Sequence, residues 1–363
     1  MGWYREHRRD LPWRRTSDPY GIWVSEAMLQ QTRVETVEGY WIRFMKRFPT
    51  AEALAEAPEE DLLAAWSGLG YYRRARSLQA AARVIVEEHG GEFPRDRDAV
   101  RALPGVGPYT AGAVLSIAFD APEPLVDGNV ERVFARLFEL EGARGSRELV
   151  GECWRFAEAL VPRRVAKSVA TPGEWNQALM ELGATVCTPK SPACGVCPVA
   201  LSCAARRSGR QDQLPAPKPT REPIDVEIEI YVAAAGFGGE VRAGGVAHWL
   251  EQRPRTGRMA GLWQFPTVEL TDGEPRLFPR DLPESPGFAL EPEGDLFELK
   301  HGITHHRIRA RVRSARIAGR PPAHWRSVRA ADASELGLTG MARKVAQRLD
   351  SSLGGLFAEG SSS

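Results

Sequence analysis

The chain has 363 residues, of which 43% are hydrophobic and 26% are charged, a composition typical of a globular protein long enough for two domains. Its formal net charge is only +1, so we expect any polyanion to be bound by local basic patches rather than by the whole surface. The charged N-terminus and the lack of a long apolar run predict no signal peptide, no transmembrane helix and no membrane partner. We therefore expect a cytoplasmic protein.

The first part of the chain has helical periodicity almost throughout. Apolar residues recur at helical spacing from residue 3 to about 205, as in the segments 19–37 and 74–91. Asp18 before Pro19 and Asp96 are helix-start signals, and glycines close several of the expected helices. These signals predict an all-α domain over residues 1–208.

A linker and a different periodicity follow. Residues 209–223 are rich in proline and polar side chains and predict an extended linker. Beyond them apolar residues alternate with polar ones in 225–235, 246–253 and 296–317, which indicates strands. We expect an α+β domain over 224–350 and a flexible tail over 351–363.

Four of the five cysteines are clustered. They follow the pattern C-x6-C-x2-C-x5-C at Cys187, Cys194, Cys197 and Cys203. In a chain with no secretory signal this pattern predicts a metal site rather than disulfides, and either zinc or an iron-sulfur cluster suits four thiolates. The single C-x2-C pair and the wide outer gaps favour a [4Fe-4S] cluster. Cys153 stands apart, and we expect it to be a buried small hydrophobe.

The stretch LPGVGPYTAGAVLS, residues 103–116, has the form of a helix-hairpin-helix. Gly105 and Gly107 allow a tight turn before Pro108, and the backbone amides at the start of the next helix are suited to bind a DNA phosphate. Such a contact positions a protein on DNA without reading its sequence. The alternative is a plain connection between two helices of a bundle.

Two carboxylates are candidates for acid–base catalysis. Glu26 lies close to the apolar positions of its expected helix, and a carboxyl held against apolar groups has a raised pKa that suits a general acid. Asp127 precedes another helix, where an N-cap is the simple interpretation and a carboxylate that meets positive charge on a substrate is the functional one. One neutral and one ionised carboxyl group are typical of enzymes that cleave glycosidic bonds.

Several motifs occur in the same order as in a known family. The segments LPWR (11–14), DPYGIWVSEAMLQQTRV (18–34), GLGYYRRAR (68–76), LPGVGPYTAGAVLS and VDGNVERVFARLF (126–138), with the four cysteines, resemble the adenine DNA glycosylases of the MutY family. The segments 250–266 and 301–308 are similar to the C-terminal domain of that family, so the resemblance covers nearly the whole chain.

The resemblance implies a fold and an activity. The expected fold is an all-α helix-hairpin-helix glycosylase domain with an iron-sulfur cluster loop, linked to an α+β Nudix-like domain of the MutT type. The expected activity is base-excision repair, in which adenine opposite 8-oxoguanine, or opposite guanine, is flipped out of double-stranded DNA and hydrolysed from its sugar. We expect a nucleoid-associated monomer whose downstream repair partners the sequence does not identify.

The resemblance also implies roles for individual residues. Glu26 is the acid that protonates adenine, Asp127 stabilises the sugar cation with the help of Asn129, and Tyr109 lines the site. The residues around the adenine pocket are Arg9, Trp13, Arg14 and Gln177. Leu29, Gln31 and Tyr71 match residues that fill or flank the gap in the DNA, and Ile303, Thr304 and His305 match a Phe-Ser-His loop that inspects 8-oxoguanine. Ile303 departs from that pattern, because it stands where the family has phenylalanine and therefore lacks the aromatic ring.

Two other functions remain open. An endonuclease III-like glycosylase with lyase activity uses a lysine in the hairpin region, but Tyr109 occupies the matching position and GVGPYTAG contains no lysine. The second is a non-catalytic DNA-binding protein whose Fe-S cluster is the functional centre. The C-terminal domain lacks an acidic Nudix box, so we expect it to recognise DNA rather than to hydrolyse a nucleotide.

Overall fold

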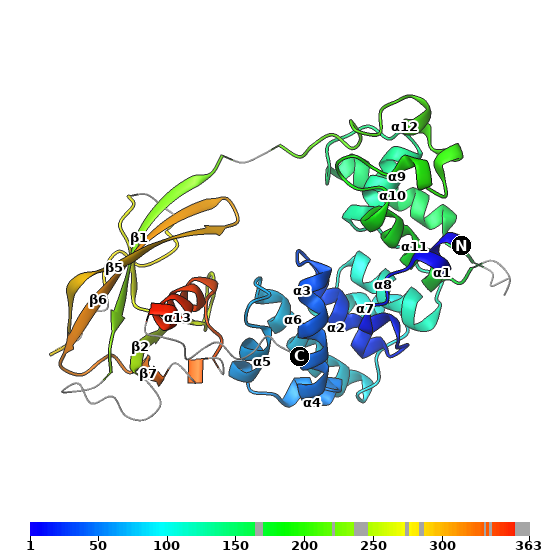
Figure 1. Ribbon diagram of the computed structural model, residues 1–363. Coiled ribbons are helices and arrows are strands. Elements are labelled where there is room, and N and C mark those ends of the chain that lie inside the picture. The colour runs from blue at the N-terminus through cyan, green and yellow to red at the C-terminus, as the bar shows by residue number, and fades with distance from the viewer. Residues whose placement is uncertain are drawn as a thin grey trace. The chain divides into compact units, whose positions relative to one another are not determined.

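The computed structural model describes residues 1–163, 170–219, 222–235, 246–272, 276–282, 287–329, 332–333 and 336–352. The chain divides into two compact units. The first comprises Met1–Glu56 and Arg73–Thr220, and the second comprises Ala57–Tyr72 and Arg221–Ser363 (Figure 1). No helix of the described residues is both long and apolar enough to span a bilayer.

The first unit is all-α, as its sequence predicts. Its α-helices are α1 (Gly2–His7), α2 (Pro19–Leu29), α3 (Val34–Arg47), α4 (Ala51–Glu56), α6 (Arg73–His89), α7 (Arg97–Ala102), α8 (Pro108–Phe119), α9 (Gly128–Leu137), α10 (Arg147–Leu160), α11 (Pro172–Thr185) and α12 (Ala204–Arg207). Three 3-10 turns complete it: η1 (Pro12–Arg14), η2 (Cys194–Val196) and η3 (Ala200–Ser202).

Aspartate caps begin two of the helices of this unit. Asp18 accepts hydrogen bonds from the backbone amides of Tyr20 and Gly21 at the start of α2, and Asp96 caps α7 in the same way. Such caps satisfy amides that have no partner within the helix. Helix α2 is buried from Tyr20 to Met28, so it is enclosed on all sides rather than along one apolar stripe.

The expected helix-hairpin-helix is formed by α7 and α8. Gly105 lies in the turn with φ +77°, and a Cβ atom there would lie 2.4 Å from the Cβ of Ser77. Both the backbone conformation and the close approach therefore require glycine. Gly107 is the N-cap of α8, and Pro108 occupies the first turn.

A core of aliphatic and aromatic side chains joins α8, α9, α10 and α11. It includes Val130, Phe134, Leu149 and Leu182. Cys153 is fully buried in this core, and burial raises the pKa of its thiol to about 12, so the prediction of a buried small hydrophobe is confirmed.

The first residues of the predicted linker are held against the helical unit. The backbone of Ala216 exchanges hydrogen bonds with Gly142 and Arg144, at 3.0 and 2.8 Å. Arg210 pairs with Glu139 and Glu141. The proline-rich composition did not indicate this attachment, because the partners lie about seventy residues earlier in the chain.

The second unit combines helix α5 (Glu59–Trp66) with the α+β fold expected for the C-terminal part. A four-stranded sheet has the order β4-β1-β6-β5, from β4 (Thr267–Glu269), β1 (Ile224–Ala233), β6 (His306–Ala318) and β5 (Ala289–Ile303). Only β1 and β6 are parallel in it. A three-stranded antiparallel sheet has the order β3-β2-β7, from β3 (Trp263–Gln264), β2 (Ala247–Gln252) and β7 (Trp325–Arg329).

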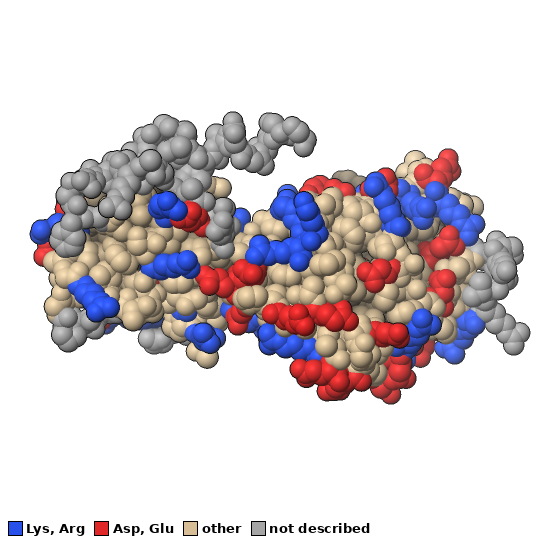
Figure 2. All heavy atoms as spheres, turned by 90° about the horizontal axis from the view of Figure 1, so that it is seen from below, with Lys and Arg blue, Asp and Glu red and all other residues tan. Residues whose placement is uncertain are grey.

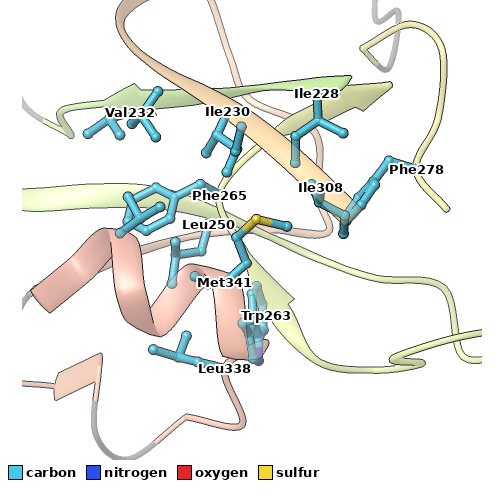
Figure 3. Close-up of a cluster of buried hydrophobic side chains, with 14 of the residues drawn as sticks. Ile228, Ile230, Val232, Leu250, Trp263, Phe265, Phe278, Ile308, Leu338 and Met341 are labelled. Atoms are coloured by element: carbon cyan, nitrogen blue, oxygen red, sulfur yellow. The ribbon is translucent and has the colours of Figure 1, made fainter. Parts of the chain in front are cut away.

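Helix α13 (Gly340–Ser352) shares the main core of this unit. Figure 3 shows Met341 among Ile228, Ile230 and Phe265, whose side chains come from β1 and from the segment after β3. Apolar residues alternate with exposed ones along β6, so one face of its sheet contributes to the core.

Basic and acidic side chains both occur on the face of the molecule that Figure 2 shows. Figure 2 shows one face, on which both signs occur side by side and no continuous basic surface is present. This distribution agrees with the formal net charge of +1.

Candidate active site

A cavity of about 570 Å³ lies within the helical unit. Its walls come from η1, α2, α8, α11 and the start of α9. The structure brings together on these walls most of the residues that the sequence singled out: Arg9, Trp13, Arg14, Glu26, Leu29, Gln31, Tyr109, Asp127, Asn129 and Gln177. Segments separated by more than 150 residues therefore meet at one site.

Glu26 projects from the buried helix α2 and is only 5% exposed. The pKa of this carboxyl is raised to about 7, chiefly by burial and also by the negative charge of Asp127. A hydrogen bond from Tyr109 and the positive charge of Arg14 act in the opposite direction. The carboxyl group is therefore suited to hold a proton near neutral pH and to release it to a substrate.

Tyr109 lies in the first turn of α8 and contacts Glu26 directly. Its hydroxyl donates a hydrogen bond to Oε2 of Glu26 at 2.5 Å and lies 3.5 Å from Sδ of Met180. Burial and the neighbouring carboxylates raise the pKa of the phenol well above its usual value, so it remains a donor. The turn that the glycines form thus places a neutral hydroxyl beside the acid.

Asp127 is the N-cap of α9, as the simple interpretation of its sequence predicts, and it also faces the cavity. It accepts hydrogen bonds from the backbone amides of Asn129 and Val130 at 2.9 and 2.7 Å, and from Nδ2 of Asn129 at 2.8 Å. Burial holds the pKa of Asp127 above its usual value, and these donors limit the rise. The donors hold the carboxylate in place and favour its ionised form.

A chain of contacts leads from Asp127 to the first cysteine. Asn129 accepts a hydrogen bond from Nη2 of Arg132 at 2.9 Å, and Nε of Arg132 donates to the carbonyl of Cys187 at 2.7 Å. Nη1 of Arg136 lies 3.3 Å from Sγ of Cys187. Helix α9 therefore joins the candidate catalytic carboxylate to the cysteine loop.

The four clustered cysteines line one small cavity of about 30 Å³ with apolar walls. Among the described residues no group of three or more His, Cys, Asp or Glu side chains is arranged to hold a single metal ion. The thiols thus surround a common space without meeting at one point.

Glu181 on α11 was missed by the sequence interpretation. It is fully buried and lines the main cavity, where it binds Arg9 and Arg14. It follows Gln177 by four residues and so lies on the same face of its helix, which is the signal that could have identified it.

Leu29 and Gln31 lie where α2 ends, and α6 holds this end in place. Nη1 of Arg74 donates to the carbonyl oxygens of Ala27 at 2.9 Å and Met28 at 2.7 Å. Gln31 has φ 59°, so the chain turns sharply there. The turn is thus fixed by a cation at a helix C-terminus, where unpaired carbonyl groups favour positive charge.

The remaining predicted residues belong to the second unit. Tyr71 is 52% exposed and has φ 48°. Thr304, with φ 54°, and His305 form the turn between β5, which ends at Ile303, and β6. A two-residue turn with a left-handed residue gives an exposed tip.

Two family models match separate parts of the chain. The model described as HhH-GPD superfamily base excision DNA repair protein matches residues 24–158, and the NUDIX domain model matches residues 240–348. The first contains Glu26, Tyr109 and Asp127, and the second contains the turn at 303–305.

Two curated relatives are similar over most of the chain. The chain is 38% identical to an adenine DNA glycosylase of Rattus norvegicus over 89% of its own length and 70% of the relative's. It is 40% identical to an adenine DNA glycosylase of Homo sapiens over 74% of its length, and it spans 56% of that relative. Among solved structures, a thermostable thymine-DNA glycosylase aligns with 57% of this chain and 93% of its own, with 31% identity and a TM-score of 0.50.

Proposed function

Because this chain belongs to the family of adenine DNA glycosylases, we propose that it hydrolyses the N-glycosidic bond of adenine paired with 8-oxoguanine or with guanine in double-stranded DNA. The observation that carries this proposal is the pair of buried carboxyl groups on one cavity. Glu26 has a pKa of about 7, and the carboxylate of Asp127 is held by three hydrogen bonds.

The reaction begins with the base outside the duplex. The cavity of about 570 Å³ has room for a flipped nucleotide, whose unstacking costs a few kcal/mol that protein contacts offset. Glu26 gives its proton to a ring nitrogen of adenine, which makes the base a better leaving group. Tyr109 stays hydrogen-bonded to the carboxylate that results.

The bond between the sugar and adenine then breaks, and both bonding electrons leave with the base. Asp127 stabilises the positive charge that develops on the sugar, with its carboxylate oriented by Asn129. Water adds its oxygen to the sugar carbon and gives up a proton, which restores the acid. The products are free adenine and an abasic site.

The chemistry of Tyr109 favours hydrolysis alone. A lyase needs an amine nucleophile that forms a Schiff base with the sugar. The phenol of Tyr109 occupies the corresponding place, and no lysine lies among the residues named on the cavity walls. We therefore assign a monofunctional glycosylase.

We also propose that Cys187, Cys194, Cys197 and Cys203 hold a [4Fe-4S] cluster. Four thiols around one apolar space, with no three arranged for a single ion, suit a group that places several iron atoms between its ligands. Bound there, such a cluster would contribute folding free energy and would hold in place the loop that Arg132 and Arg136 contact. The hydrolysis itself requires no electron transfer.

The second unit is assigned to recognition of the base opposite adenine. Its Nudix-like fold carries the exposed turn of Thr304 and His305 at the end of a hairpin, where a side chain can reach a ligand. We propose that the protein acts as a monomer on damaged duplex DNA.

A panel of duplexes tests the function. Single-turnover base release is measured with adenine opposite 8-oxoguanine, guanine and cytosine, and with thymine opposite guanine. We expect release of adenine from the first two duplexes and none of thymine. Release of thymine alone would assign the chain to another glycosylase specificity, and no release from any duplex would favour a non-catalytic DNA-binding protein.

A further inference from the structure

A buried ion-pair network forms one wall of the cavity. Glu181 on α11 accepts hydrogen bonds at Oε1 from the backbone amide and Nε of Arg9, at 3.0 and 2.9 Å. Its Oε2 accepts from Nη2 of Arg9 at 3.0 Å and from Nη2 of Arg14 at 2.7 Å. One carboxylate thus binds two guanidinium groups, and Nη1 of Arg14 also donates to the carbonyl of Arg9 at 3.1 Å.

The carboxylate at the centre of the network is enclosed by protein. Glu181 is 0% exposed, and the side chains of Arg9 and Arg14 are 35% and 11% exposed. Burial alone raises the pKa of Glu181, but the hydrogen bonds from Arg9 and Arg14 and the charge of Arg14 lower it to about 2. Glu181 is therefore ionised at every pH at which the enzyme works, and it does not serve as an acid.

We propose that Glu181 is a positioning residue that fixes the guanidinium groups of Arg9 and Arg14 on the cavity wall and balances their charge beside the acid Glu26. This inference rests on the proposed glycosylase function. It assigns to Glu181 no contact with the reacting atoms, because it acts through the two arginines.

The physical reason lies in the charges that face Glu26. From η1, Arg14 favours the carboxylate form of Glu26, and from the start of α9, Asp127 favours the neutral form. From α8, Tyr109 donates a hydrogen bond to it. Without Glu181, the charge of Arg14 would act on Glu26 without compensation and draw the proton from the acid.

The other elements packed against α2 carry charges that act elsewhere. From α6, Arg74 donates to carbonyl oxygens at the C-terminal end of the helix. From α3, the charges of Glu35 and Glu38 act on Arg9. Glu181 is thus the carboxylate that is hydrogen-bonded to Arg14, the cation whose charge acts on the acid.

The pH profile of single-turnover adenine release, with enzyme in excess over an adenine:8-oxoguanine duplex, tests this role. In wild-type protein the rate falls at high pH as Glu26 loses its proton. Glu181→Gln should move this basic limb down by about one pH unit. Compared with wild-type protein, the rate should then be about tenfold lower at pH 8 and should differ by less than about twofold at pH 5.5. A merely structural defect would lower the rate by the same factor at both pH values, and that result would overturn the proposal.

Two further variants keep the test valid if Glu181→Gln does not fold. Arg14→Gln removes the cation and should move the basic limb to higher pH, whatever it does to adenine affinity. Glu181→Asp keeps the charge and should leave the limb where wild-type protein has it. The proposal would be contradicted if the basic limb of Arg14→Gln did not move. It would also be contradicted if the limb of Glu181→Asp moved as far as that of Glu181→Gln.

The matched control is Glu174→Gln. Glu174 lies on the same helix and binds Arg5 through two hydrogen bonds at 3.0 and 2.8 Å, but this pair is exposed and lies outside the cavity. We expect its pH profile to match that of wild-type protein. A wild-type protein that releases no adenine at any pH would overturn the proposed function, whereas active protein with unmoved limbs would overturn only the role of Glu181.

Discussion

The buried acid should make the helical unit less stable at high pH. The folded protein raises the pKa of Glu26 from 4.5 to about 7, so the native state holds a proton that the unfolded chain has lost between these two pH values. The stability of wild-type protein therefore falls as the pH rises through this window and stays low above it. A shift of about 2.5 units corresponds to roughly 3 kcal/mol, because one pKa unit is worth about 1.4 kcal/mol.

Glu26→Gln removes this titration and keeps an oxygen that can accept the hydrogen bond of Tyr109. The variant should match wild-type protein near pH 5 and should be more stable by up to about 3 kcal/mol at pH 8. Amide hydrogen exchange of peptides from α2 measures this difference locally, since a gain of that size slows exchange by roughly two orders of magnitude. Comparison at the same pH cancels the intrinsic dependence of exchange on pH.

Glu174→Gln provides a control in which the expected change in stability at pH 8 has the opposite sign. The hydrogen bond from Arg5 lowers the pKa of Glu174, so its contribution to stability is present above the unfolded pKa and is lost as the pH falls. Removing it should cost some stability at pH 8. A Glu26→Gln variant that is equally stable at pH 8, or less stable than wild-type protein, would refute the assignment of Glu26 as a buried acid with a raised pKa.

Three other changes test separate parts of the site. Tyr109→Phe removes a hydrogen bond that favours the carboxylate of Glu26, so the basic limb of adenine release should move up by about one pH unit; a limb moved down would contradict the contact. Replacing residues 303–305 by glycines should lower the preference for 8-oxoguanine over guanine in the base-release assay, and an unchanged ratio would show that this turn takes no part. Purified protein should be coloured and contain about four irons per chain by metal analysis, with loss of both in Cys197→Ser; colourless, iron-free wild-type protein would reject the cluster.

Local signals in the sequence predicted much of the fold. Helical periodicity, the caps at Asp18 and Asp96, and the glycines of the hairpin predicted the helices around the site, and alternation predicted β1 and β6. Each of these signals depends on residues within one or two turns or along one strand, which is the range over which propensity and pattern act.

The parts that escaped prediction depend on distant contacts. The amphipathic pattern of α3 can be read from its own residues, 34–47. Helix α2, in contrast, is buried on all sides because neighbouring helices cover it, and its own sequence does not show this. Glu181 binds arginines 167 and 172 residues earlier in the chain. The grouping of residues 57–72 with the second unit also joins segments separated by about 150 residues, and no local pattern predicts such a contact.

The central claim is that Glu26 supplies the proton that releases adenine. Its most direct test is single-turnover release from an adenine:8-oxoguanine duplex by Glu26→Gln, with binding of the same duplex measured in parallel. We expect adenine release to be abolished while the variant still binds the duplex. Adenine release at the wild-type rate by a folded, DNA-bound Glu26→Gln protein would contradict it.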